Sequence, residues 1–158
     1  MKTIVNALFT LVSLLALAGC QTEFQGIQSS RVAAMTEAIR SEPPGDYFIG
    51  RRYYKQDYKF WGYVRKPGQP WVSAQLVMLN EQKKLAPDRE KNAIGSDNGY
   101  EYKLYGSFSG ETVYEPASDG FYPEFVLTGY ELLSAAPPPV FRSSAAVDPV
   151  RRVIERPR

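Results

Sequence analysis

The sequence predicts a mainly β protein: a small barrel of five or six strands with one short helix near its N-terminus. Three observations support this fold class. Runs of aromatic and β-branched residues, the types enriched in strands, recur between residues 46 and 136. Glycines interrupt these runs where a strand would have to bend, and turn-forming sequences separate them. The 158 residues, less a leader, suffice for one ordinary domain with short appendages.

The first predicted element is a helix that begins at Ser29 or Ser30, either of which can cap it, and runs to Arg40. Its apolar residues recur at helical spacing, and the two prolines of residues 41–45 end it. A helix this short is marginal in isolation. We therefore expect it either to pack on the domain or to fray.

Three strands are predicted in the first half of the β domain, at residues 47–54, 58–65 and 71–79. The second and third are joined by a turn at residues 66–70, because Pro67 has its φ preset and Gly68 accepts a positive φ. In the third strand, alternation predicts one core face and one more polar face. The predicted core face comprises Val72, Ala74, Leu76 and Met78, and the opposite face comprises Ser73, Gln75 and Val77.

The second half begins with a long charged connection at residues 80–99, which can hold a helical turn and ends in the turn sequence Asn98-Gly99. Strands are predicted at residues 100–106 and 111–114, with a bend or bulge between Gly106 and Gly110. The last strand, at residues 124–133, is partly apolar on both faces. This pattern favours a central or covered position in the sheet.

The succession of three strands, an interruption and further strands over residues 46–133 resembles an OB-like barrel, in which bends at glycines let the strands curl around one core. The resemblance rests on architecture, without a family motif. A β-sandwich and an SH3-like barrel fit the same residues and remain alternatives. Closure of a barrel would also protect the edges of so many aromatic strands from pairing with other chains.

The N-terminus has the three parts of an export signal: the basic Lys2, an apolar run at residues 4–17, and small residues before a cysteine in Leu17-Ala18-Gly19-Cys20. This pattern resembles the lipobox of bacterial lipoproteins. The resemblance implies cleavage between Gly19 and Cys20, lipidation of the Cys20 thiol and acylation of the new amino terminus. Two or more acyl chains hold a protein firmly on a membrane.

The alternative for this segment is an uncleaved transmembrane helix, but the apolar run is shorter than the roughly 20 residues that cross a bilayer. Gln21 follows the cysteine where aspartate marks retention in the inner membrane of Gram-negative bacteria, so the resemblance favours the outer membrane. The expected organisation is a signal peptide (1–19), a lipidated cysteine with tether and short helix (20–45), a β domain (46–136) and a tail (137–158). The domain would face the periplasm or the cell surface.

The tail is rich in proline and arginine, has no sustained apolar period, and is predicted to be disordered. The alternative is a basic arm that contacts anionic lipid or cell-wall carboxylates. The charge of the β domain is close to neutral without this tail. Bulk charge and export both therefore argue against a nucleic-acid partner.

Most catalytic chemistry is excluded by composition, since the chain has no histidine and its single cysteine is the predicted lipidation site. No metal site and no cofactor are expected, because Asp97-Asn98-Gly99 and Asp119-Gly120 lack the ligand ladder of a calcium loop. A hydrolase acting through two carboxylates remains. The acids available for it, among which spacing selects no pair, are Glu81, Asp88, Glu90, Asp97, Glu101, Glu111, Glu115, Asp119, Glu124 and Glu131. We therefore expect no enzymatic activity.

Aromatic content is the positive feature, with 11 Tyr, 8 Phe and 2 Trp. Tyrosine offers a flat apolar face and a hydroxyl, which suits a sugar ring or a peptide. One hypothesis is an outward-facing binding platform, formed by Tyr53, Tyr54, Tyr58, Trp61 and Tyr63. The other interpretation, which we prefer, is that these rings pack the barrel, because small barrels fill their interiors with large side chains.

Three functions follow in order of preference. The first is a membrane-anchored envelope lipoprotein that binds a protein or a cell-wall glycan without catalysis. The second is a structural lipoprotein that assists assembly of an outer-membrane complex, and the third is the carboxylate-dependent hydrolase. An exposed aromatic cluster would favour the first, an unpaired strand edge the second, and facing acids in a cleft the third.

Overall fold

The computed structural model describes residues 30–158; the predicted signal peptide, Cys20 and the tether fall outside them. Residues 30–40 are helical, as the sequence predicted, and within this helix the Thr36 hydroxyl donates a hydrogen bond to the carbonyl of Val32. Among the described residues, no helix combines the length and apolar character needed to span a bilayer. The barrel belongs to the compact unit Ile39–Arg158.

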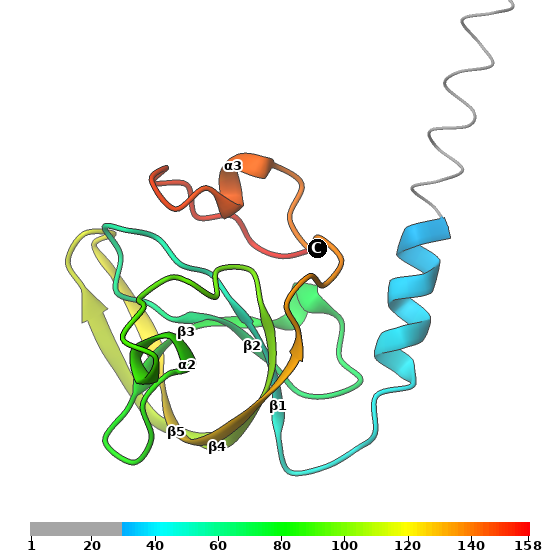
Figure 1. Cartoon of the computed structure of the whole chain (residues 1–158), viewed down its shortest axis with the longest axis horizontal. Coiled ribbons are helices and arrows are strands. Elements are labelled where there is room, and N and C mark those ends of the chain that lie inside the picture. The colour runs from blue at the N-terminus through cyan, green and yellow to red at the C-terminus, as the bar shows by residue number, and fades with distance from the viewer. Residues whose placement is uncertain (1–29) are drawn as a thin grey trace, which may run out of the picture. The chain divides into compact units, whose positions relative to one another are not determined.

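Five strands form a closed barrel in the order β1-β2-β3-β5-β4 (Figure 1). The strands are β1 (Phe48–Arg52), β2 (Gly62–Arg65), β3 (Gln75–Asn80), β4 (Glu101–Glu115) and β5 (Gly120–Ser134). Every neighbouring pair is antiparallel except β3 and β5, which run parallel. The connection between β3 and β4 carries the expected helical turn, α2 (Pro87–Glu90). The predicted small OB-like barrel is therefore confirmed.

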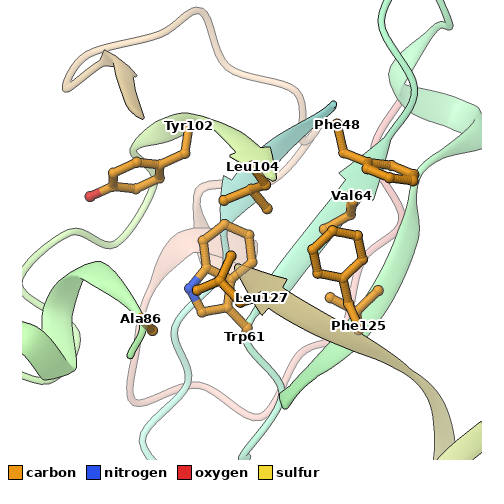
Figure 2. Close-up of a cluster of buried hydrophobic side chains, with 9 residues drawn as sticks. Phe48, Trp61, Val64, Ala86, Tyr102, Leu104, Phe125 and Leu127 are labelled. Atoms are coloured by element: carbon orange, nitrogen blue, oxygen red, sulfur yellow. The ribbon is translucent and has the colours of Figure 1, made fainter. Parts of the chain in front are cut away.

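The barrel interior is filled by side chains from every strand and from the connection before α2 (Figure 2). Phe125 and Leu127 of β5 and Leu104 of β4 are fully buried. The rings of Phe48 and Phe125 meet edge to face, with centroids 5.0 Å apart. Such edge contacts let aromatic rings fill a small barrel without leaving voids.

The predicted inward face of the third strand is wrong. Val77, assigned to the polar face, is completely buried, whereas Val72 is 67% exposed. The reason is a 3-10 turn at η1 (Trp71–Ser73), where the Ala74 amide bonds the Trp71 carbonyl. The strand begins only at Gln75, so an alternation counted from Val72 runs out of phase with the pleat.

The predicted turns agree with the structure. The Gln69 amide donates to the Lys66 carbonyl across a turn in which Gly68 has a φ of +75°. Pro67 and Gly68 thus take the two central places that their backbone preferences suit. Gly99 likewise has a positive φ, +82°, and only Tyr100 separates it from β4.

Strands β4 and β5 form a long hairpin that continues beyond the barrel (Figure 1). The two predicted strands at residues 100–106 and 111–114 are one element, β4, with the expected irregularities as register shifts at Tyr105/Gly106 and Phe108/Thr112. At Gly106, φ is +148° and a Cβ would lie 2.1 Å from the Val126 carbonyl oxygen. Only glycine permits this bend, which lets the hairpin leave the barrel wall.

The tail differs from the disordered segment that the sequence predicted. Residues 140–158 run back over the β1–β2 side of the barrel and include a short helix, α3 (Ser144–Val147) (Figure 1). Val140, Phe141 and Ala146 are buried. A few anchors and main-chain hydrogen bonds order this segment, and neither produces the apolar period by which sequence reasoning identifies structure.

Candidate binding surface

The five residues of the predicted aromatic platform do not form an outward surface. Tyr53, Trp61 and Tyr63 are at most 4% exposed, while Tyr54 and Tyr58 are half-buried. Trp61 belongs to the barrel core, where its ring faces Tyr102 (Figure 2). The structure therefore favours the packing interpretation over the platform hypothesis.

Tyr53 and Tyr63 belong to a second aromatic cluster, under the C-terminal segment. The Tyr53 ring stacks on Phe60 at 5.9 Å and tilts against Phe141 at 4.9 Å, and Tyr63 contacts both Tyr53 and Phe141. Phe141 comes from the tail, and the other three come from the loop after β1 and from β2. The rings predicted to bind a partner thus pack against the chain's own C-terminal residues.

The hydroxyl groups of this cluster donate to main-chain carbonyls of the tail. Tyr53 donates to Val153 and Tyr63 to Glu155, both at 2.9 Å, and the half-buried Tyr58 donates to Arg152 at 3.2 Å. Burial raises the pKa of Tyr53 and that of Tyr63. These hydroxyls consequently remain protonated, and remain donors, through the physiological pH range.

Lys55 is the most buried cation of this surface, at 1% exposure. Its ammonium donates to three main-chain carbonyls of the tail: Ala145 at 3.3 Å, Asp148 at 2.8 Å and Arg151 at 2.9 Å. Burial lowers the pKa of Lys55, and the negative charge of Asp148 partly opposes that shift. Three carbonyl acceptors satisfy all three ammonium hydrogens, which makes burial of this charge tolerable.

A different aromatic pair is exposed, at the end of the β4–β5 hairpin. Tyr114 and Phe121 are register partners whose ring centroids lie 5.1 Å apart, and they are 48% and 70% exposed. The Tyr114 hydroxyl donates to the carboxylate of Asp119 at 2.9 Å. This pair is not among the residues of the predicted platform. It could have been found by pairing residues symmetrically across the loop at 116–119, since such residues meet on one face of a hairpin.

The opposite face of the hairpin end is fixed to the loop between β1 and β2. The Tyr122 ring lies 5.7 Å from Phe60, and the buried carboxylate of Glu115 accepts main-chain hydrogen bonds from Ala117, Ser118 and Lys59. Burial alone would raise the pKa of Glu115, but these hydrogen bonds outweigh it and lower the pKa. The ionised carboxylate thus holds the hairpin end in place.

Replacing Glu115 with glutamine should lower the free energy of unfolding at pH 7 by about 2 kcal/mol, because charge-assisted hydrogen bonds are lost. A lowered pKa stabilises the fold above the ordinary glutamate pKa, and that stabilisation is lost as the pH falls through the folded-state value. The gap between parent and variant should therefore narrow below about pH 4.5. Thermal melts at pH 7 and pH 3 measure it. Glu111→Gln, an exposed change on the same hairpin, is the control, and equal melting of both variants at pH 7 would contradict the anchoring role.

Two of the acids considered for a hydrolase lie together, but they are buried around a cation. Arg52 donates to Asp88 at 3.0 Å, and its Nε lies 3.4 Å from Asp97, which also accepts the Tyr102 hydroxyl. Burial raises the pKa of Asp97 despite the charge of Arg52. For Asp88, burial is outweighed by Arg52 and by the Gly95 and Arg89 amides, so its pKa is lowered. Both acids are at most 2% exposed, so this network is structural, with no access for a substrate.

A second group of buried charges, Arg51 and Arg65, lies near the β2–β3 turn. The guanidinium groups of Arg51 and Arg65 lie over the Trp71 ring, at 5.0 and 4.5 Å from its centroid. Arg65 pairs with Glu42 through two hydrogen bonds of 2.7 and 2.6 Å, and Glu42 also accepts the Gly68 amide. This bidentate pair secures the segment before β1 to the turn after β2.

Within residues 30–158, no three acidic, histidine or cysteine side chains converge as metal ligands would. The described part of the chain thus offers two surfaces of interest: the exposed aromatic pair on the hairpin, and the tyrosine and lysine donors beneath the tail. Comparison with protein-family models, with curated proteins and with solved structures finds no match for this chain.

Proposed function

We propose that this chain is a membrane-anchored envelope lipoprotein whose barrel binds a protein or cell-wall glycan without catalysing a reaction. The observation that carries the proposal is the exposed pair of Tyr114 and Phe121. The lipobox resemblance at Cys20 supports the anchor, and the absence of histidine supports binding over catalysis. The outer membrane is the favoured location, because Gln21 follows the cysteine.

The hairpin presents its two rings as a binding site requires. The two exposed rings lie in contact and so form a contiguous apolar patch, the feature that marks interaction sites, and aromatic side chains supply much of the energy of interfaces. The hairpin end is held by Glu115 and by the Tyr122–Phe60 contact, so little order has to be gained on binding. In OB-like barrels the loop between the last two strands is a recurrent site for oligosaccharides.

Asp119 adds a polar group beside the rings. Its carboxylate already accepts the Tyr114 hydroxyl and is exposed, so its remaining lone pairs can accept hydroxyl hydrogens from a sugar or amide hydrogens from a peptide. Aromatic faces for the apolar side of a sugar ring, together with an adjacent carboxylate, suit a glycan. The same group suits a protein that inserts an apolar side chain between polar contacts.

A second candidate, the structural lipoprotein, is favoured by the edges of the hairpin. Residues 112–115 pair with residues 120–123, and among the described residues neither segment pairs with another strand on its outer side. Such edges can accept a strand from a partner protein. This mode of binding would use main-chain groups, so it would tolerate loss of the aromatic rings.

Photocrosslinking in intact cells tests the proposal. A photoreactive residue at Phe121 should give a discrete adduct, and its mass and fragmentation distinguish a glycan from a protein. The same residue at Val72, which is 67% exposed but lies outside the hairpin, is the matched control. Fractionation of these cells tests the anchor, since Cys20→Ser should leave the membrane pellet. Identical adducts at both positions, or none at either, would refute the hairpin as a binding site.

The double variant Tyr114→Ser/Phe121→Ser should weaken capture of that partner by about tenfold or more, as expected for central aromatic contacts. Stability should change little, because exposed substitutions usually stay within about 0.5 kcal/mol each. Purified protein is assayed by binding to the crosslinked partner and by thermal melting. Undiminished binding with an unchanged melting temperature would favour edge pairing, the second candidate, over the aromatic pair.

A further inference from the structure

The surface beneath the tail donates hydrogen bonds to main-chain carbonyls of the tail. Four side chains of residues 53–63 donate to six carbonyl oxygens of the C-terminal segment, residues 140–158. The donors are Tyr53, Lys55, Tyr58 and Tyr63. Main-chain groups add to this pattern, since the Gln56 amide donates to the Pro149 carbonyl at 2.9 Å. This concentration of donors on carbonyls is the pattern of a surface that binds a peptide through its backbone.

Only some side chains of the bound segment are buried against the barrel. Val150 is 69% exposed, and Val153 and Ile154 are 41% and 40% exposed, although their neighbouring carbonyls are held. Phe141, in contrast, is 7% exposed and packs on Tyr53 and Tyr63. The segment is therefore bound by its main chain and by the buried side chains of Val140, Phe141 and Ala146, while the apolar side chains of Val150, Val153 and Ile154 are exposed.

One side chain adds charge selectivity. The guanidinium of Arg152 lies 2.6 Å from the carboxylate of Asp57. Both side chains of this pair are exposed, so it contributes modestly to affinity and more to the choice of partner. The connection between barrel and segment is short and mostly exposed, at residues 135–139, and Arg51 holds it by one hydrogen bond to Pro138.

We infer that the surface formed by Tyr53, Lys55, Tyr58 and Tyr63 is a peptide-binding site, for which the C-terminal segment is the resident ligand. Its ligand class is a polypeptide with an aromatic anchor, a short helical turn after it and, about eleven residues after the anchor, an arginine that pairs with Asp57, as Phe141, α3 and Arg152 do here. A partner segment of this kind would bind in place of the tail. The site uses neither Tyr114 nor Phe121 and stands independently of the proposed hairpin function.

Cleavage of the connection in the full-length protein tests this inference. A protease site inserted between Ala136 and Pro137 allows the purified chain to be nicked after folding. The nicked segment should stay bound through size exclusion, and excess fluorescent peptide of residues 137–158 should replace it saturably while circular dichroism shows an intact barrel. Replacement only at the rate of global unfolding would overturn the inference, since the segment would then be an inseparable part of the fold.

Variants of barrel and peptide separate backbone recognition from general packing. Lys55→Met and Tyr53→Phe should each weaken peptide binding about tenfold, because each removes hydrogen bonds to main-chain carbonyls of the peptide. Tyr105→Phe, whose hydroxyl bonds Glu131 elsewhere, is the matched control and should change binding less than about twofold. A peptide with Val150→Ser and Val153→Ser should also bind within about twofold, whereas Phe141→Ala should lose about tenfold. Equal losses from the exposed valines and from Phe141 would refute main-chain recognition.

Discussion

Replacing Arg52 with methionine is expected to lower the free energy of unfolding by about 3–5 kcal/mol, the cost of removing one partner from a buried ionic network. Arg52 is 6% exposed, and its guanidinium is the cation shared by Asp88 and Asp97. It also donates to the carbonyls of Phe60 and Trp61, in the connection that leads into β2. Without it, Asp88 and the two carbonyls lose a hydrogen-bond donor, and Asp97 loses the cation that pairs with it. Urea unfolding at pH 7 measures the loss.

The pH dependence of the lost stability shows whether stranded charges or lost packing cause it. In the parent, the lowered pKa of Asp88 means that its stabilising contribution is lost as the pH falls. In Arg52→Met, no cation opposes burial, so the folded state favours protonated carboxyls and the penalty is relieved at acid pH. The stability gap should therefore shrink from pH 7 to pH 4. The double variant Arg52→Met/Asp97→Asn should lose less than the single one, because it removes one of the stranded charges. A gap independent of pH would attribute the loss to packing instead.

The barrel could be predicted because its determinants are local. Pro67 and Gly68 specify a turn whatever surrounds them, and the alternation of Tyr102 and Leu104 marks the inner face of β4 without knowledge of its neighbours. The closed order of strands was favoured for a related reason. One long interruption between the third and fourth strands leaves few arrangements that bury the inner faces of all five strands.

Features that depend on distant contacts were missed. In the sequence, Lys55 and Arg65 look like ordinary surface cations. Lys55 is buried because it donates to carbonyls of the tail, and Arg65 is buried because it pairs with the carboxylate of Glu42. The tail itself is ordered mainly through its backbone, which has no sequence signature. The inward face of β3 was predicted wrongly because a 3-10 turn precedes the strand, and a shift of one residue exchanges the two faces of a strand.

The platform hypothesis, the less preferred of the two interpretations of the aromatic residues, shows the same limit in a sharper form. Composition identified aromatic residues as the functional feature, but density along the chain selected the cluster at residues 53–63, where the rings are mostly buried. Exposure was found instead on Tyr114 and Phe121, which are separated in sequence and joined only by hairpin register. A high density of aromatic residues along the chain therefore marked buried clusters, while pairing across the hairpin turn marked the exposed aromatic pair.

The second large effect is expected at Trp61, and it distinguishes buried aromatic residues from exposed ones. Trp61→Ala should lower the free energy of unfolding by about 3–5 kcal/mol, and the melting temperature by about 10 °C or more. The ring is 4% exposed and belongs to the barrel core. It packs so closely that a Cβ placed on Gly50 would lie 2.9 Å from its edge. Relaxation into the space left by the indole is therefore limited, because the surrounding strands close on themselves.

Phe121→Ala, the matched control, removes an aromatic ring of which 70% is exposed, and should shift the melting temperature by less than about 2 °C. Thermal melts of the parent and both variants, followed by far-ultraviolet circular dichroism, make the comparison. A Trp61 variant that melts with the parent would mean that its ring is not part of the core, and would restore the platform around residues 53–63. A Phe121 variant that melts as early as Trp61→Ala would instead assign the hairpin end to the core, because a ring that contributes that much stability must be buried in solution.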